Sequence, residues 1–459
     1  MTKTLAALLA ATAPVAALAS TPGQVDSGDT AIVLVSAGLV LLMTPGLAFF
    51  YGGLVRSKNV VHTMILSLVC MALVGVLWGL FSYSLSFAPG GALDRFVGGL
   101  SFAGMHGVGA AVAPDLAPTI PHAAFMLFQA MFAVITPALI SGSVVERVRV
   151  KAFVLFVAIW SVIVYTPVAH WVWAPGGWLR QLGALDFAGG TVVHINAAAA
   201  AVVFALVLGR RRGLKHPTVL PHNVPFAILG AGLLWFGWLG FNGGSALAAN
   251  GLAAYAFSNT FFAPAAAALA WGMAELLLFH GKMSGVGLAS GAVAGLVAIT
   301  PAAGFVTPLS AMALGALAGI ASLMAVRYRP RLGLDDSLDV FAVHGVAATL
   351  GALLTGILAS KAVNPDGADG SLRLLGVQAL GVLATYLWSG GLSFLILKLV
   401  GFVTPLRADE QDEWTGMDIS ESGERGYVTT DMEGGSTSGF SALEPAARPH
   451  RTPAHAAAE

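Results

Sequence analysis

Long apolar stretches alternate with short polar segments along nearly the whole chain. A helix needs about 20 mostly apolar residues to cross a lipid bilayer. Eleven stretches meet or approach that length: residues 30–52, 61–86, 122–144, 152–172, 187–209, 224–243, 254–279, 284–300, 305–326, 340–360 and 372–403. The eighth is the shortest. The pattern predicts an all-α membrane protein with eleven transmembrane helices.

Composition supports the bilayer as the solvent. The 459 residues are 57% hydrophobic and only 10% charged, with a mean hydropathy of +0.80, whereas soluble domains carry about 25% charged residues. The formal net charge is zero, so the chain lacks the basic excess expected of a nucleic-acid-binding protein.

The two ends differ from the apolar middle. Residues 1–19 combine Lys3 with an apolar run and the small-residue pattern Ala17-Leu18-Ala19, which predicts a cleaved signal peptide. Residues 20–403 form the predicted transmembrane domain. Residues 404–459 are first acidic and then rich in Gly, Ser, Pro and Ala, which predicts a cytoplasmic tail with a disordered end.

Basic residues fall mainly on one side of the predicted spans, and cytoplasmic loops are typically rich in Lys and Arg. With the N-terminus outside, fifteen basic residues lie on the inner side: Arg56, Lys58, Arg147, Arg149, Lys151, Arg210, Arg211, Arg212, Lys215, Lys282, Arg327, Arg329, Arg331, Lys398 and Arg407. Only four lie outside: Arg95, Arg180, Lys361 and Arg373. The count predicts a periplasmic N-terminus and a cytoplasmic C-terminus.

An internal repeat relates spans 1–5 to spans 6–10. Asp186 and Asp336 each precede a histidine, His194 and His344, by eight residues. In addition, Leu42, Gly46, Phe50, Gly52 and Gly53 match Leu233, Gly237, Phe241, Gly243 and Gly244. Because five is odd, the two halves run through the membrane in opposite directions, followed by an eleventh helix. Inverted repeats are typical of transporters, whose substrate path lies near the pseudo-two-fold axis.

His194 and His344 are the two histidines well inside predicted spans. An ionisable group there is a functional candidate, because desolvation is costly. If the two meet on the axis, one imidazole can donate a hydrogen bond and the other accept it. The alternatives are separate bonds to neighbouring helices, or a haem or metal redox site; the chain has no Cys-X-X-Cys-His motif.

Other polar and aromatic residues allow a structural and a functional interpretation. Asp186 and Asp339 begin their spans and are predicted to cap helices, while Glu275 is predicted to reach the membrane interface. Aromatic side chains follow each other at helical spacing in two spans: Phe128 and Phe132, and Trp235, Trp238 and Phe241. Such rings belong to an interfacial belt or hold a small cation by cation–π attraction.

Five segments resemble the ammonium transporter family (Amt/MEP/Rh), in its bacterial branch. Residues 186–197 read DFAGGTVVHINA, residues 238–246 read WLGFNGGSA, and residues 128–141 read FQAMFAVITPALIS, followed by ERVR at 146–149. Residues 291–306 read GAVAGLVAITPAAGFV, and residues 339–346 read DVFAVHGV. In one departure, the loop between Trp173 and Asp186 is one residue longer than the family form.

The resemblance implies a homotrimeric transporter with one pore per subunit, not an enzyme, without metal or cofactor. Trp173 and Ser245 would recruit ammonium at the outer mouth, with Phe132 and Trp238 nearby and Asp186 supporting the site from behind. Phe132 and Phe241 would form a gate, and His194 and His344 would line the pore. The implied function is ammonium or ammonia transport across the bacterial inner membrane; the alternatives are an ammonium sensor signalling through the tail and a CO2-type gas channel.

The tail suggests a protein partner. Its segment from Asp409 to Tyr427 is acidic and could lie across the basic inner loops at Arg210–Arg212 and Arg327–Arg329. It resembles the family's tail, with Ser422 in place of an expected histidine. The resemblance implies docking of a trimeric PII-type nitrogen-signalling protein; the alternative is a tail that only ends the chain.

Overall fold

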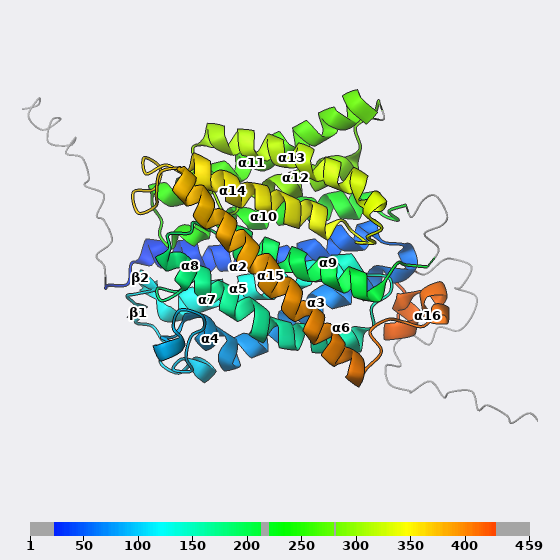
Figure 1. The fold of residues 1–459 in the computed structure, drawn as a ribbon, viewed down its shortest axis with the longest axis horizontal. Helices are drawn as coiled ribbons and strands as arrows, with labels where there is room; N and C mark the ends of the chain where they lie inside the picture. Colours follow the sequence, from blue (N-terminus) through cyan, green and yellow to red (C-terminus); the bar gives the residue numbers. More distant parts are fainter. Residues whose placement is uncertain (1–22, 213–219, 280, 428–459) are drawn as a thin grey trace, which may run out of the picture.

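The computed structural model describes residues 23–212, 220–279 and 281–427, and its long helices lie side by side in one bundle (Figure 1). The helices are α2 (Ser27–Leu54), α3 (Val60–Leu77), α4 (Tyr83–Phe87), α5 (His122–Val144), α6 (Val150–Trp160), α7 (Thr166–Trp173), α8 (Trp178–Gln181), α9 (Asn196–Leu208), α10 (Val224–Gly243), α11 (Gly251–Ala274), α12 (Gly285–Ile299), α13 (Pro308–Tyr328), α14 (Ala347–Leu358), α15 (Leu372–Val403) and α16 (Glu410–Thr415). Short helical turns extend or join several of them: η2 (Ser57–Asn59), η3 (Trp78–Ser82), η6 (Ser161–Tyr165), η7 (Gly190–Ile195), η8 (Gly244–Ala246), η9 (Glu275–Phe279), η10 (Arg329–Leu332), η11 (Phe341–Val346) and η12 (Asp418–Ser422).

The prediction of eleven apolar helices is confirmed. In the described part of the chain, ten helical segments are long and apolar enough to cross a membrane, and α12 is a shorter apolar helix. It corresponds to the predicted eighth span, which was also the shortest. The predicted signal peptide and the tail beyond residue 427 lie outside the described residues.

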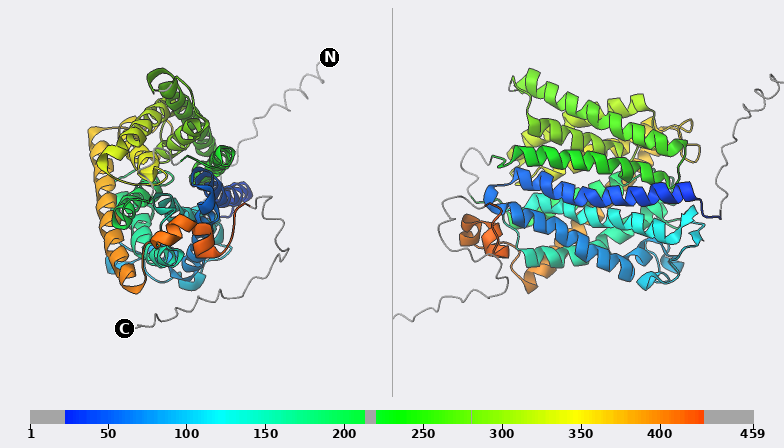
Figure 2. Two further views of the ribbon diagram at one scale, coloured as in Figure 1. Left: turned by 90° about the vertical axis from the view of Figure 1, so that its right-hand side faces the viewer. Right: turned by 180° about the vertical axis from the view of Figure 1, so that it is seen from behind.

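The two ends of the bundle carry different structures (Figures 1 and 2). One end, called the outer end after the predicted orientation, carries η4 (Gly91–Leu93), η5 (Ala103–Met105) and an antiparallel strand pair, β1 (Val112–Ala113) and β2 (Ala117–Pro121). The opposite, inner end carries α16 and η12 of the tail, which Figure 2 shows packed on the bundle.

Spans 1 and 6, which the repeat matches to each other, cross in close contact. A Cβ atom at Gly230 of α10 would come within 2.2 Å of the backbone nitrogen of Phe50 in α2, and one at Gly46 within 3.0 Å of Leu233 Cβ. Small residues allow such approach between helices in a membrane, where backbone packing replaces the hydrophobic effect. Glycine in the apolar pattern therefore fixes this crossing.

The two histidine-bearing segments enter the bundle from opposite ends, as an inverted repeat requires. The turn before η7 lies at the outer end, where Ala188 N donates to Thr300 O at 3.2 Å. The turn before η11 lies at the inner end, where Leu338 N donates to Gly142 O at 3.0 Å, near the inner end of α5. Spans 5 and 10 therefore run antiparallel.

The helix starts confirm one predicted cap and correct the other. The Asp186 carboxylate accepts the N–H groups of Gly189, Gly190, Thr191 and Val192 at 2.6–3.1 Å. In the second half this role belongs to Asp336, which accepts Phe341 N at 2.7 Å.

The prediction that Asp339 caps its helix is wrong. Asp339 has a left-handed backbone conformation (φ 60°) and pairs with Arg329 at 3.1 Å. Its side chain is therefore engaged by the end of span 9 and not by the helix it precedes.

The prediction that Glu275 reaches the membrane interface is also wrong. Only 9% of this residue is exposed. Its carboxylate accepts hydrogen bonds from Trp271 Nε1 at 3.1 Å and Ser284 N at 2.9 Å. Glu275 thus joins η9 to the start of α12, because nearby donors satisfy the carboxylate inside the protein.

The acidic tail lies across basic loops as predicted, but of the predicted arginines it pairs with Arg212, and it also pairs with Arg149. Arg149 pairs with Asp409 and Asp412 at 3.1 Å and with Glu421 at 2.9 Å. Arg212 pairs with Glu410 at 2.5 Å. The expectation for the other inner arginines is wrong, since Arg210 donates to Gly333 O, Arg329 pairs with Asp339, and Arg327 lies over the Phe279 ring.

Candidate functional site

A cavity of about 180 Å³ opens at the outer end, and three predicted site residues line it: Phe132, Trp173 and Ser245. Trp173 Nε1 donates to Asp186 O at 2.9 Å, so the indole is held in place through its only donor while its ring stays free for other contacts. Ser245 Oγ donates to Phe241 O at 2.8 Å, which leaves its lone pairs as acceptors. The cavity therefore combines an aromatic ring with an acceptor oxygen.

Phe132 lines this cavity, and behind it lies a second phenylalanine ring, Phe241. Phe132 of α5 and Phe241 of α10 are stacked, with ring centroids 4.2 Å apart and planes 28° apart. Both are almost fully buried, at 1% and 0% exposure. Phe128 and Trp173 contact Phe132 edge-on, with centroids 4.9 and 5.7 Å away, so neighbouring rings hold it in place.

His194 and His344 meet beyond the ring pair. Their Nδ1 atoms are 3.3 Å apart, their ring planes differ by 18°, and each residue is 2% exposed. A hydrogen bond between two Nδ1 atoms requires one to carry a proton and the other to be free. His194 Nε2 has no hydrogen-bond partner among the described residues.

Trp238 lies with the histidines and not with the outer cavity. Its ring stacks on His194, with centroids 5.2 Å apart and planes 17° apart, and its Nε1 donates to Thr300 Oγ1 at 2.8 Å. Among the described residues, it is not part of the lining of the outer cavity. Trp238 also contacts Phe241, with ring centroids 5.4 Å apart, so it joins the ring pair to His194; its place near the recruitment site stays a prediction.

A second cavity, of about 510 Å³, opens from His344 toward the inner end. Tyr51, Glu275, Arg329 and Asp339 contribute to its lining. Burial raises the pKa of Asp339 to about 7, against the opposing effect of Arg329. The ring pair and the histidine pair thus lie between an outer and an inner cavity.

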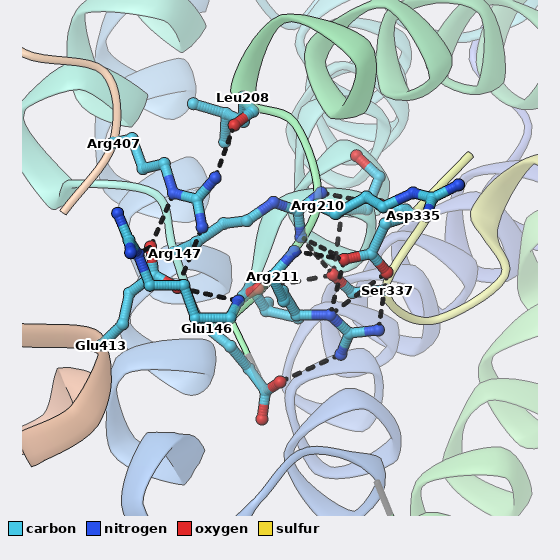
Figure 3. Close-up of polar contacts among 12 residues, drawn as sticks. Glu146, Arg147, Leu208, Arg210, Arg211, Asp335, Ser337, Arg407 and Glu413 are labelled. Atoms are coloured by element: carbon cyan, nitrogen blue, oxygen red, sulfur yellow. Dashed lines mark hydrogen bonds and ion pairs between the residues drawn. The ribbon is translucent and has the colours of Figure 1, made fainter. Parts of the chain in front are cut away.

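Buried ion pairs join the loops at the inner end (Figure 3). Arg211 bonds Glu146 at 2.9 Å and Asp335 at 2.8 Å, and all three side chains are at most 6% exposed. Burial alone would raise the pKa of Glu146, but Arg211 and Arg56 outweigh it and hold this pKa at about 2. Arg211 lines the inner cavity together with His344, but in the described part of the chain no hydrogen bond or ion pair joins the cluster to the histidine pair, so its role is structural.

Sequence reasoning missed three residues of the cavities. Gln129 lines the outer cavity, and Glu275 and Asp339 line the inner one. Gln129 lies one turn before Phe132 on α5, so helical spacing alone could have placed it on the same side. In the part of the chain that the structure describes, no group of three or more His, Cys, Asp or Glu side chains could hold a metal ion.

Comparisons with known proteins agree with this architecture. The model of the Ammonium Transporter Family matches residues 31–427. An ammonium transporter of Bacillus subtilis is 48% identical over 405 residues, covering 87% of this chain and 98% of that protein. One from Mycobacterium tuberculosis is 46% identical over 435 residues, covering 88% and 91%.

Solved structures are also similar. The crystal structure of Saccharomyces cerevisiae Mep2 has a TM-score of 0.78 at 35% identity, covering 85% of this chain and 89% of that one. A protein described as a sensor Amt protein has a TM-score of 0.78 at 30% identity, covering 86% and 98%. An apolar helix bundle with two cavities and an inverted repeat defines a multi-pass membrane transport protein. The matches show that the chain belongs to the ammonium transporter family.

Proposed function

We propose that this chain moves ammonium or ammonia across the bacterial inner membrane through the path between its two cavities. The observation that carries the proposal is the His194–His344 pair, buried behind the Phe132–Phe241 stack and between the cavities. Each subunit of a homotrimer has its own path in this proposal.

Capture takes place at the outer cavity. The Trp173 ring attracts a cation through its π face, an interaction of about 0.5–2 kcal/mol. Ser245 Oγ accepts one N–H of ammonium, because its own proton is directed to Phe241 O. Asp186 does not touch the ion; it accepts four backbone N–H groups and its carbonyl holds the Trp173 indole.

The phenylalanine pair favours loss of the proton from ammonium, because it excludes water from the path. A bare cation between buried rings loses its hydration, which costs tens of kcal/mol in a simple Born estimate. Burial lowers the pKa of an ammonium group by up to about 3–5 units. Ammonium therefore gives up its proton before neutral ammonia passes Phe132 and Phe241; the proton either returns to water in the outer cavity or is carried across separately.

The histidine pair supplies hydrogen-bonding groups in an otherwise apolar path. Two neutral imidazoles that share one proton offer ammonia a donor and an acceptor without fixed charge. The free Nε2 of His194 is an atom that ammonia can contact. Stacking of Trp238 on His194 keeps the ring in the lumen.

Purified protein in proteoliposomes tests the proposal. Ammonium pulses should give uptake in the wild type, and potassium pulses should not. His194→Ala and His344→Ala should each abolish or sharply reduce ammonium uptake, or admit potassium. Wild-type rates and selectivity in both variants would remove the histidine pair from the path.

The same assay separates the alternatives. A sensor would bind ammonium and show no uptake, and a CO2-type channel would acidify the vesicle lumen faster with CO2 than with ammonium. Current that accompanies uptake would show that charge crosses with ammonia, while uptake without current would show neutral ammonia alone.

The proposed orientation places the N-terminus left after signal cleavage and the outer end in the periplasm, and the tail in the cytoplasm. The arginines of the inner end, among them Arg149, Arg211 and Arg212, lie at the end of the bundle that carries the tail. Such an end is typically cytoplasmic. Cysteine labelling at an inner position in sealed vesicles tests the orientation, and native mass measurement tests the trimer.

We infer further that a PII-type protein docks on the inner face over the tail. The tail presents acidic side chains over basic loops, so the surface offers both signs of charge to a partner. Truncation after Ala408 keeps the bonds of Arg407 to Leu208 and of Ala408 to Arg147. This truncated chain should still transport ammonium but lose inhibition by a cognate PII protein, measured at low and high 2-oxoglutarate.

A further inference from the structure

The outer cavity contains a buried polar group that the capture step above leaves unused. Gln129 lines this cavity together with Trp173 and Ser245. Only 9% of the residue is exposed, and its amide oxygen has no hydrogen-bond partner among the described residues. A buried acceptor without a partner costs about 1–3 kcal/mol, so something outside these side chains must satisfy it.

The chemistry of the cavity indicates which ligand could bond to the Gln129 oxygen. Each of the other polar side chains at this cavity donates a hydrogen bond to a backbone carbonyl. Trp173 Nε1 donates to Asp186 O, Ser245 Oγ donates to Phe241 O, and Arg180 donates to Trp173 O. What remains is an aromatic face, the lone pairs of Ser245, the amide of Gln129 and the further N–H groups of Arg180, whose guanidinium is held at the Trp173 carbonyl. At the π face and the acceptor oxygens, a ligand that fits is small, cationic and a donor only.

Ammonium has these properties, with one positive charge, four N–H donors and no acceptor. The amide group of glutamine rotates about its last torsion between two broad minima. It can therefore present its oxygen to the cavity without moving the helix. The three groups come from three different segments of the chain, α5, α7 and η8, and so they approach the cavity from different sides.

We propose that Gln129 is a specificity-determining residue of the outer site, whose amide oxygen accepts an N–H of ammonium next to the Trp173 ring and Ser245 Oγ. This inference rests on the proposed transport function. It also assigns Gln129 a role in capture that is separate from the ring pair one turn further along α5.

Substitution by residues of similar size tests the role of the oxygen. Gln129→Met keeps the length of the side chain and removes the acceptor. It should raise the half-saturating ammonium concentration about ten-fold, as expected for losing a hydrogen bond to a charged group. Gln129→Glu keeps an acceptor and adds negative charge, so its half-saturating concentration should equal or fall below the wild-type value.

A matched control is Leu127→Met on the same helix, where the side chain is 42% exposed on the surface of the bundle. It should leave half-saturation unchanged. Transport is measured as ammonium uptake into proteoliposomes over a range of ammonium concentrations, with the maximal rate and the half-saturating concentration fitted separately. Folding of each variant is followed by thermal unfolding in detergent.

The outcomes separate this inference from the proposed function. A lower maximal rate in Gln129→Met with unchanged half-saturation would show a structural residue and overturn the inference. A raised half-saturation in both Gln129 variants would overturn it as well, since the carboxylate keeps the acceptor. If Trp173→Leu shifts half-saturation and Gln129→Met does not, the inference fails alone; if the wild type carries no ammonium, the proposed function fails first.

Discussion

Two regions bury polar side chains inside the bundle: the proposed pore, where His194 meets His344, and the inner end, where Arg211 meets Glu146 and Asp335. In the pore, the groups are imidazoles that bond each other through a single pair of atoms. At the inner end, Arg211 is bonded to carboxylates from two other loops. Both regions are almost completely shielded from water.

The difference shows where a buried charge stabilises this protein and where a buried charge would hinder passage of the substrate. A paired charge links loops strongly, because removing one partner leaves the other without compensation. A fixed charge in the pore would instead bind or repel every ion that entered. Neutral donors and acceptors avoid both effects, so the pore keeps polar contacts without an ionic barrier.

Breaking the inner cluster should have the largest effect on stability. Arg211→Met leaves Glu146 and Asp335 without their shared guanidinium, at a cost of roughly 3–5 kcal/mol. We expect a clearly lower thermal midpoint in detergent and less protein in the membrane. Arg210→Met is the control, since Arg210 is exposed and donates only to Gly333 O; an equal loss there would contradict the special role of Arg211.

Acid should weaken the inner cluster. The pKa of Glu146 in the folded protein is about 2, below its ordinary 4.5. The ionised form therefore stabilises the folded state above about pH 4.5, and this contribution is lost as the pH falls toward 2. The thermal midpoint of the wild type should drop between pH 5 and 3, and Glu146→Gln should show a shallower slope over the same range. Parallel slopes would remove Glu146 as the cause.

Loss of the Trp173 ring should act on capture. A cation–π contact of about 0.5–2 kcal/mol corresponds to a rise of roughly 2- to 30-fold in the half-saturating concentration for Trp173→Leu. The maximal rate should change less. An unchanged half-saturation would exclude Trp173 from the outer site.

Removing both pore histidines together should cost little stability. Deleting both partners of a hydrogen bond is nearly neutral apart from packing, and no charge is left unpaired. The double change His194→Ala with His344→Ala should lower the free energy of unfolding by less than Arg211→Met does, although transport is lost. If the double variant lost as much free energy of unfolding as Arg211→Met, the two regions would not differ in how they stabilise the protein.

The tail contact should show the smallest effect. Arg149 is 22% exposed and its three partners range from 10% exposed at Glu421 to 80% at Asp409; ion pairs open to water in this way contribute about 0–1 kcal/mol each. Arg149→Met should leave the thermal midpoint almost unchanged while proteolysis of the tail becomes faster. If cleavage rates do not change, Arg149 does not hold the tail.

The sequence by itself determined the number of apolar helices, the end that collects the arginines and the positions of His194 and His344. These follow from local properties. A span requires a minimum apolar length, and a repeated Asp-to-His spacing can be read directly from the chain. The cap at Asp186 was also predictable, because a carboxylate before a helix meets free N–H groups within a few residues.

Only the tertiary structure decided which side chains meet. Asp336 caps span 10 and Asp339 does not, because a left-handed backbone at Asp339 directs its side chain toward Arg329. Glu275 stays inside because Ser284, from the next helix, satisfies it. Trp238 stacks on His194, and Gln129 lines the outer cavity, because helices distant in sequence pack against one another. Spacing along a chain fixes the face of a helix, whereas only packing fixes the distance between faces.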